Sequence, residues 1–219
     1  MKYIISFTTS PKRIHKCEPM LKSIINQSKP ADLIILNIPK VFARTGENYD
    51  IPQLVSQNCM VNIVDIDYGP ATKIIPTIKY LNENYYDKDD TRIIYLDDDI
   101  KYLEKMIEEY HRASHDNEDI WCAAGFNFYN FDIIGEWEHG KICSIAEGFG
   151  GVCVKLSCFE DDFLNYINKY INNLDIRLSD DVLISNYYNL KCKTIKILCV
   201  PGHYSREDIT LNFCVLEYG

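Results

Sequence analysis

Three consecutive aspartates, Asp97, Asp98 and Asp99, come directly after the mostly apolar run 92–96. Carboxylates this close together raise one another's pKa, whereas a bound divalent cation keeps them ionised. Oxygen ligands without thiolates or clustered histidines suit Mg²⁺ or Mn²⁺. The cluster therefore predicts a site that holds a metal ion and a diphosphate. The alternative is an exposed acidic turn in which Asp98 or Asp99 caps the next helix.

A second pair of acids, Asp180 and Asp181, stands directly before an apolar stripe of helical spacing that ends at Leu190. Acids at this place stabilise the positive N-terminal end of a helix. A carboxylate there could also take the proton of a hydroxyl group as a general base. The residue types leave both interpretations open.

The segment 147–151 is rich in glycine and lies between two apolar runs. Its spacing differs from the glycine fingerprints that bind phosphates or dinucleotides. Glycine lets the backbone come close to a ligand, so we expect Gly150 to contact a sugar, with Phe149 or Trp137 as a ring that stacks on it. The alternative is a tight turn that needs a positive φ.

The elements that position these residues follow from the alternation of apolar runs with segments of helical period, which is typical of an α/β domain. The expected strands are 2–8, 32–38, 61–66, 92–96, 120–128, 152–156 and 194–200, and the expected helices are 19–27, 71–81, 102–110 and 179–190. Residues 40–60 look like an irregular connection. The run 92–96 predicts a central strand that is buried on both faces. Ligands of open α/β sheets bind beyond the carboxyl ends of the strands, where the three aspartates lie.

Length, composition and charge restrict the class of protein. The chain has 219 residues, with 23 Lys and Arg against 32 Asp and Glu, so its formal net charge is −9. The length suits a single domain, 1–219, and 47% hydrophobic residues argue against disorder. An acidic chain is not expected to coat its surface with nucleic acid.

Cysteine usage and apolar runs indicate the compartment. The nine cysteines form no CxxC pair and several lie in apolar runs, so we expect reduced, buried thiols in the cytoplasm. No run reaches the roughly 18 apolar residues of a membrane span. The apolar stretch at the N-terminus is also too short for a signal peptide.

Four segments, in this order and spacing, carry a resemblance to a known family. They are SFTTSPKRI (6–14), LNIP (36–39), DYGPATK (67–73) and YLDDDI (95–100). Together they resemble the small GT-A-type glycosyltransferases of large DNA viruses, in particular the N-terminal glycosyltransferase domain of a chlorella-virus protein. The resemblance is strongest over residues 3–100. It implies a Rossmann-like mixed sheet flanked by helices, and a viral enzyme would act in the host cytoplasm or the virion.

The resemblance further implies a nucleotide-sugar half over about 1–100 and an acceptor half over about 101–219. The donor would be of the UDP type. Its diphosphate needs cations in the pocket of a net-acidic protein, and Arg13 and Lys73 could supply them. The residues expected to bind the donor are Thr8, Arg13, Asp67, Lys73, Asp97 and Asp98.

A metal ion and a general base complete the implied site. Mn²⁺, or Mg²⁺ in its place, would be bound by Asp99 and Asp97, and His203 would complete the metal shell. For His203 the alternative is a loop histidine near the surface. Inverting enzymes of this kind often place the base at the start of a late helix, which favours Asp181 over Asp180.

The expected function is the metal-dependent transfer of a sugar from a UDP-sugar to a hydroxyl acceptor such as a glycan, with inversion at the anomeric carbon. Retention stays open, because the sequence sets no geometry at that carbon. A metal-dependent nucleotidyltransferase or phosphohydrolase could use the same carboxylates. A nucleotide-sugar-binding module without activity is the third hypothesis.

Overall fold

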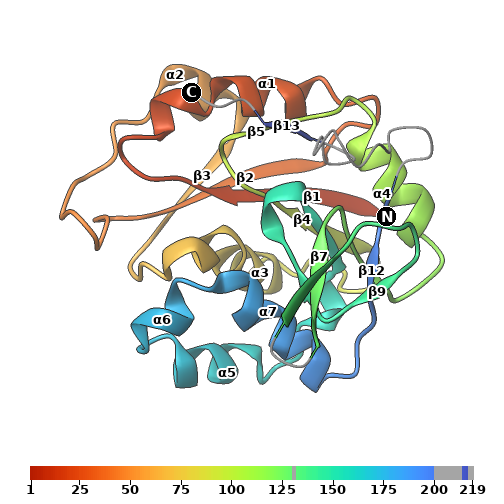
Figure 1. The fold of residues 1–219 in the computed structure, drawn as a ribbon. Helices are drawn as coiled ribbons and strands as arrows, with labels where there is room; N and C mark the ends of the chain where they lie inside the picture. The colour runs from red at the N-terminus through yellow and green to blue at the C-terminus, as the bar shows by residue number, and fades with distance from the viewer. Residues whose placement is uncertain (130–131, 200–213, 217–219) are drawn as a thin grey trace.

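The computed structural model describes residues 1–129, 132–199 and 214–216. A large mixed sheet forms the centre of the fold, with helices on both of its faces and two smaller sheets beside it (Figure 1). This is the mixed α/β architecture that the alternating sequence pattern predicts.

The main sheet has the strand order β3-β2-β1-β4-β11-β6-β12-β9. Its strands are β1 (Lys2–Thr8), β2 (Leu33–Pro39), β3 (Met60–Val64), β4 (Thr91–Tyr95), β6 (Ile120–Cys122), β9 (Ile142–Cys143), β11 (Val152–Lys155) and β12 (Ile195–Ile197). The first four in space are parallel, whereas β11 runs antiparallel to both β4 and β6. Every residue of β4 is buried, so the predicted central strand is confirmed.

The helices divide between the two faces of the sheet (Figure 1). They are α1 (Glu18–Ile25), α2 (Gln53–Asn58), α3 (Ile75–Glu83), α4 (Met106–Ser114), α5 (Phe163–Tyr170), α6 (Leu174–Arg177) and α7 (Asp180–Leu190), with 3-10 turns η1 (Ile14–Lys16), η2 (Gly69–Lys73), η3 (Gly148–Gly150) and η4 (Leu156–Cys158). Side chains alternate along β1, so Tyr3, Ile5 and Phe7 pack against α1, α2 and α4, while Ile4 packs on the opposite side.

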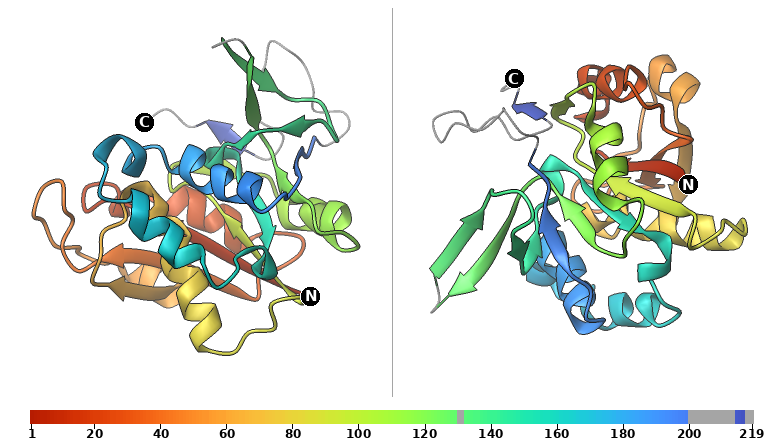
Figure 2. Two further views of the ribbon diagram at one scale, coloured as in Figure 1. Left: turned by 90° about the horizontal axis from the view of Figure 1, so that it is seen from below. Right: turned by 90° about the vertical axis from the view of Figure 1, so that its right-hand side faces the viewer.

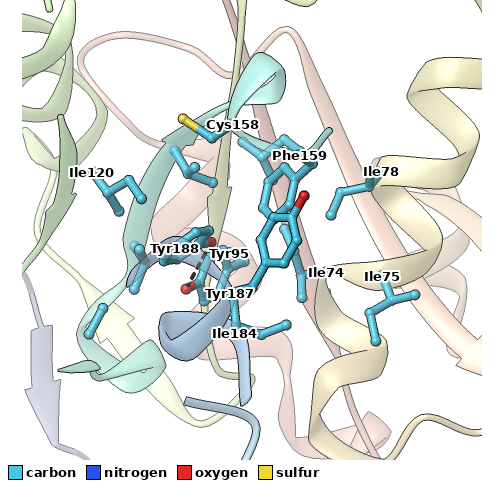
Figure 3. Close-up of a cluster of buried hydrophobic side chains, with 14 of the residues drawn as sticks. Ile74, Ile75, Ile78, Tyr95, Ile120, Cys158, Phe159, Ile184, Tyr187 and Tyr188 are labelled. Carbon is cyan, nitrogen blue, oxygen red and sulfur yellow. Dashed lines mark hydrogen bonds between the residues drawn. The ribbon is translucent and has the colours of Figure 1, made fainter. Parts of the chain in front are cut away.

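The second core cluster fixes α7, whose first residues carry the predicted base. Leu183, Ile184, Tyr187 and Tyr188 are buried against α3, α5 and the sheet (Figure 3). The Tyr188 hydroxyl donates a hydrogen bond of 3.4 Å to the Tyr95 hydroxyl at the end of β4. This packing sets the start of α7 beside the carboxyl ends of the parallel strands.

Two of the predicted helices begin later than the periodicity indicates. The segment 71–81 is split at Ile74 into η2 and α3. The segment 102–110 begins with a strand, β5 (Ile100–Tyr102), and its helix starts only at Met106. Tyr102 also forms the end of β5 because this strand pairs with β13 (Cys214–Leu216), a partner from the far end of the chain.

The predicted strand 120–128 is also divided. Ala123 and Ala124 interrupt it, so β6 stays in the main sheet and β7 (Gly125–Tyr129) joins β8 (Asp132–Glu136) and β10 (Ile145–Ala146) in a separate sheet. The connection 40–60 contains the short helix α2, which the sequence analysis missed. The last predicted strand, 194–200, is shorter than expected, at Ile195–Ile197.

Cysteine placement agrees with the expectation of reduced, buried thiols. The cysteines among the described side chains are free, and all of them except Cys192 are buried. The helices of the described ranges include none that is long and apolar enough to cross a membrane.

Candidate active site

The three aspartates lie in the turn between β4 and β5, beyond the carboxyl end of the central strand. Their carboxylates do not share one environment. Asp98 is buried, Asp97 is half-buried and Asp99 is exposed. Asp98 and Asp99 share the cation Arg13, whereas Asp97 pairs with Lys73.

Asp98 anchors the turn to the loop that follows β1. Its carboxylate accepts a hydrogen bond from the Thr9 hydroxyl and forms an ion pair with Arg13. Burial raises the pKa of Asp98, against the opposing effects of Thr9 and Arg13. Arg13 also forms an ion pair with Asp99 at 2.6 Å. Asp98 and Arg13, both predicted donor ligands, thus hold each other in this structure.

Lys73 lies at the centre of the site. Its side chain is 4% exposed, and its Nζ lies 2.7 Å from Oδ1 of Asp97 and 2.9 Å from Oδ2 of Asp180. Burial alone would lower the pKa of Lys73, but the carboxylates of Asp180, Asp97 and Asp181 outweigh burial and raise it well above its usual value. The ammonium group of Lys73 therefore joins the β4 turn to the start of α7.

A buried polar network holds the Lys73 backbone in place. The Ser6 hydroxyl of β1 donates to the Lys73 carbonyl, and Ser6 and Thr77 hydroxyls also bond to each other at 2.6 Å. The Asn37 amide of β2 donates to the Thr77 hydroxyl at 2.7 Å. Buried polar groups of this kind are stable only when they find partners, so the network gives η2 one defined position.

Asp181, the residue predicted to act as the general base, lies at the start of α7 beside the glycine-rich loop. Its Oδ1 accepts a hydrogen bond of 2.9 Å from the Gly148 N–H. Burial raises the pKa of Asp181 most, Lys73 lowers it, and Asp180 raises it again, with the result at about 7. A base with a pKa near neutral combines a useful ionised fraction with strong proton affinity.

Gly148 approaches both charged groups so closely that no side chain fits there. A Cβ at this position would lie 2.6 Å from Nζ of Lys73 and 3.0 Å from Oδ1 of Asp181. The glycine-rich run therefore serves to bring a backbone N–H to Asp181. The sequence analysis expected close backbone approach in this run but assigned it to a sugar.

Tyr102 links the glycine-rich loop to the aspartate turn. Its hydroxyl donates to the Phe149 carbonyl at 2.8 Å and accepts from the Asp97 N–H at 3.2 Å. The sequence analysis missed Tyr102 because it placed this residue at the start of a helix. Only the pairing of β5 in the folded chain brings Tyr102 to the site.

Asp67 and Thr8 lie away from the Lys73 cluster in their contacts. Asp67 accepts hydrogen bonds from the Ala43 and Gly69 N–H groups, at 2.8 and 2.7 Å, and its Oδ1 lies 3.3 Å from Arg177. The Thr8 hydroxyl donates to the Asn37 carbonyl at 2.8 Å. Asp67 therefore organises the β3–η2 loop through Arg177, which the sequence analysis did not single out. The contacts of Asp67 and Thr8 with the nucleotide-sugar donor stay predictions.

The residues predicted to meet the acceptor are partly covered. Trp137 and Phe149 are half-buried and pack against the core cluster under α1 and α4. Gly150 is buried, and a Cβ there would lie 2.8 Å from the Ala123 side chain, so its lack of a side chain serves close packing. The predicted metal ligand His203 lies outside the described residues.

The acids of the β4 turn fit a metal that substrate phosphates help to bind. Among the described residues there is no group of three or more His, Cys, Asp and Glu arranged to hold a metal. Asp97 and Asp99 remain as two oxygen donors, with side chains 36% and 58% exposed. Mg²⁺ and similar ions are commonly bound by one or two carboxylates plus substrate phosphates and water, which is compatible with this pair.

Solved structures place this arrangement in a known fold. S. aureus TarS residues 1–349, in complex with UDP, matches with a TM-score of 0.56 at 13% identity, over 90% of this chain and 58% of that one. A structure of 4-diphosphocytidyl-2C-methyl-D-erythritol synthase matches with a TM-score of 0.51 at 9% identity, over 95% and 94% of the two chains. The fold is of the GT-A type.

Structures similar to this GT-A fold include both glycosyltransferases and nucleotidyltransferases. The chain spans little more than half of the TarS fragment that it matches. No family model and no curated protein matches the sequence. Identities of 9% and 13% show the fold alone, so the activity has to be argued from the site.

Proposed function

We propose that the chain is a glycosyltransferase that moves a sugar from a UDP-type donor to a hydroxyl group of a glycan. The observation that carries this proposal is the buried ammonium of Lys73, which contacts Asp97 on the donor side and Asp180 on the acceptor side. Asp181 lies next to this pair with a pKa of about 7. The shared fold with a UDP-bound structure supports the choice of donor.

On the donor side, the chain's own groups balance the charge of the diphosphate. A bound Mn²⁺ or Mg²⁺ would be held by Asp97 and Asp99 and would stabilise negative charge on the departing diphosphate. Lys73 and Arg13 provide fixed positive charge beside these acids. Such preorganised charge stabilises a transition state without reorganisation during the reaction. The role of His203 as a further ligand stays a prediction.

On the acceptor side, Asp181 is the proposed base. The acceptor oxygen attacks the anomeric carbon, the bond from that carbon to the diphosphate oxygen breaks, and the hydroxyl proton passes to Asp181. Asp180 is the alternative base, but its carboxylate already forms an ion pair with Lys73 at 2.9 Å. Direct displacement of this kind inverts the configuration at the anomeric carbon.

The test is a panel of UDP-, GDP- and dTDP-sugars with Mn²⁺, followed by thermal stabilisation and by slow release of the nucleoside diphosphate. We expect a response to UDP compounds that falls in Asp99→Asn. Asp161→Asn, a fully exposed acid distant from the site in sequence, is the matched control. No response to any UDP compound, or a full response in Asp99→Asn, would contradict the proposal.

A nucleotidyltransferase is the second candidate, because the chain covers 94% of the 4-diphosphocytidyl-2C-methyl-D-erythritol synthase structure but only 58% of the TarS fragment. Such an enzyme would join a nucleoside triphosphate to a sugar phosphate and release pyrophosphate. Measuring pyrophosphate with CTP, UTP or dTTP and sugar phosphates separates the two activities. The resemblance to viral enzymes stays a prediction in either case.

A further inference from the structure

The two acids that are expected to share a metal ion contact cations from opposite faces of the main sheet. Asp97 contacts Lys73 of η2, a segment that packs with α7 in one core cluster. Asp99 contacts Arg13, and the next residue, Ile14, packs with α1 in the other cluster. In the right-hand view of Figure 2, α1 (red) lies above the sheet and α7 (blue) lies below it. Each acid is thus held by a separate cation.

These two ion pairs differ in how easily they can separate. Lys73 is 4% exposed and contacts a second acid, Asp180, at 2.9 Å. Arg13 is 46% exposed and Asp99 is 58% exposed, so both side chains have room to turn. Exposed ion pairs contribute little free energy, because water and salt screen them. A ligand that competes for these acids would therefore separate Arg13 from Asp99 first.

A buried acid keeps Arg13 at the site when it leaves Asp99. The same Nη2 atom that contacts Asp99 at 2.6 Å also forms an ion pair with Asp98, which is 5% exposed. Asp98 is fixed by the Thr9 hydroxyl and by the Cys17 thiol, which donates to its Oδ2 at 3.8 Å. A buried carboxylate is unfavourable without its cation, so this pair persists. The guanidinium has several N–H donors, and those that Asp98 does not use can bind another anion.

A metal ion at Asp97 and Asp99 would place further positive charge beside the Arg13 guanidinium. Like charges at this separation repel, and turning Arg13 away from Asp99 removes much of the repulsion. A nucleoside diphosphate offers the displaced guanidinium a new partner, because its planar donors match phosphate oxygens in pairs. The exchange of Asp99 for phosphate is therefore more favourable when both ligands bind than when the metal binds alone.

We propose that Arg13 and the metal compete for Asp99, and that Arg13 exchanges Asp99 for the diphosphate when metal and nucleotide bind together. This inference rests on the proposed glycosyltransferase function and adds to it the way in which the two ligands are coupled. Without nucleotide, Arg13 weakens the binding of the metal. With nucleotide, it links the two ligands, and the coupling is reciprocal: UDP strengthens the binding of Mn²⁺ by the same factor as Mn²⁺ strengthens the binding of UDP.

The test measures Mn²⁺ binding to the full chain from the electron paramagnetic resonance signal of free Mn²⁺, and UDP binding by calorimetry in the presence of Mn²⁺. Arg13→Gln removes the charge but keeps an amide that can donate to Asp98. Without UDP, we expect this variant to bind Mn²⁺ about fivefold more tightly than the wild type, because the competing charge is gone. In the presence of Mn²⁺, it should bind UDP about tenfold more weakly. General damage to the site would weaken both.

Two further variants serve as controls. Arg112→Gln on α4 removes a guanidinium that likewise contacts two acids, Glu108 and Glu109, and should bind Mn²⁺ and UDP as the wild type does. Arg13→Lys keeps the charge, so without UDP it should bind Mn²⁺ no more tightly than the wild type does. Thermal unfolding checks that each variant folds.

Two results would overturn the inference. Mn²⁺ binding by Arg13→Gln that is unchanged or weaker without UDP would show that Arg13 supports the metal site instead of competing with the metal. UDP binding that is unchanged in Arg13→Gln would show that the guanidinium does not reach the diphosphate. A wild-type chain that binds neither Mn²⁺ nor UDP would instead contradict the proposed function itself.

Discussion

The amino group of Lys73 binds two acids that come from distant parts of the chain, the turn after β4 and the start of α7. A buried ammonium is unfavourable on its own, and each of the two carboxylates contributes to its stability. The same contact sets the distance between the proposed donor and acceptor sides. At the scale of single residues, stability and function therefore depend on the same side chain.

Replacing Lys73 by methionine should lower the free energy of unfolding by about 3 kcal/mol, because it leaves Asp97 and Asp180 beside each other without their cation. Urea denaturation measures this change. Lys79→Met on the exposed side of α3 is the control and should change the free energy by less than about 0.5 kcal/mol. Equal effects of the two substitutions would show that the buried ion pairs contribute little.

The raised pKa of Asp181 predicts two opposite pH dependences. In the folded chain this pKa is about 7, against 3.8 for the unperturbed group, so between these values the folded state binds more protons than the unfolded state. The free energy of unfolding should therefore fall as the pH rises through this window, while the rate of transfer rises as the base becomes ionised. Asp181→Asn should make the fall in unfolding free energy shallower rather than abolish it, because Asp98 and Glu147 also have raised pKa values. The same substitution should abolish the pH-dependent rise in transfer rate.

The measurements are the transfer rate and the urea midpoint from pH 4 to pH 8. Asp175→Asn in the first turn of α6 is the control and should keep both slopes. A transfer rate in Asp181→Asn that keeps the wild-type pH profile would exclude this residue as the base.

Single residues could be predicted from the sequence where a local pattern marks them. Asp97 stands out because it follows a buried strand, and Asp181 because it precedes an apolar stripe. Tyr102 and Arg177 have no such local signal, since their roles come from contacts with residues far along the chain. The contact of Lys73 with Asp180 likewise appears only once η2 and α7 pack together.

At the scale of elements, η3 acts through its backbone. It brings the Gly148 N–H to Asp181 because the chain has no side chain at that point, and Tyr102 of β5 holds the next carbonyl. The Gly148 N–H thus connects η3 to the start of α7, and the Tyr102 hydroxyl connects η3 to β5. A small displacement of η3 changes the environment of both Lys73 and Asp181.

Gly148→Ala should displace η3, because the added methyl group would lie 2.6 Å from Nζ of Lys73. We expect a loss of about 1–3 kcal/mol in unfolding free energy and a transfer rate lower by about 100-fold. Gly46→Asn is the control, since that glycine has a φ of +72° with open space around it and asparagine tolerates this conformation. Wild-type activity in Gly148→Ala would mean that η3 moves without consequence for the site.

Elements were predicted well where burial alone decides the sequence pattern, on one face of a helix or on both faces of a strand. The stripe of α7 and the continuous apolar run of β4 are of this kind. β5 was missed because its three residues, of which only Tyr102 belongs to the predicted helix 102–110, form a strand through pairing with β13. β7 belongs to the three-stranded sheet with β8 and β10, whereas β6 stays in the main sheet. The period of residues 120–128 alone predicts neither the break between these strands nor the sheet that β7 joins.

At the scale of the whole molecule, β4 has two neighbours that are far apart in sequence, β1 and β11. Its two faces are covered by helices from both halves of the chain, among them α4 and α7. The sequence suggested a donor half ending near residue 100, but β11 and α7 complete the core beneath that half. The two proposed halves therefore share one core, and their division of the chemistry stays a prediction.

The fragment 1–100, expressed alone, should fail to fold. Without β11, the strand β4 becomes an edge whose apolar residues lose their cover, and such edges lead to aggregation. Sedimentation and thermal unfolding, with the full chain as the control, measure the outcome. A soluble monomeric fragment with a cooperative transition would show that the donor half folds independently.

The shared ammonium also has an evolutionary consequence. Loss of Lys73 would leave Asp97 and Asp180 without their shared cation. Loss of either acid would leave the buried ammonium with one partner instead of two. Lineages that drift at one of these three positions should therefore change the others as well. Related chains are expected to keep Lys73, Asp97 and Asp180 as a set or to have lost the set as a whole, and this inheritance pattern would separate active members from relatives that retain only the fold.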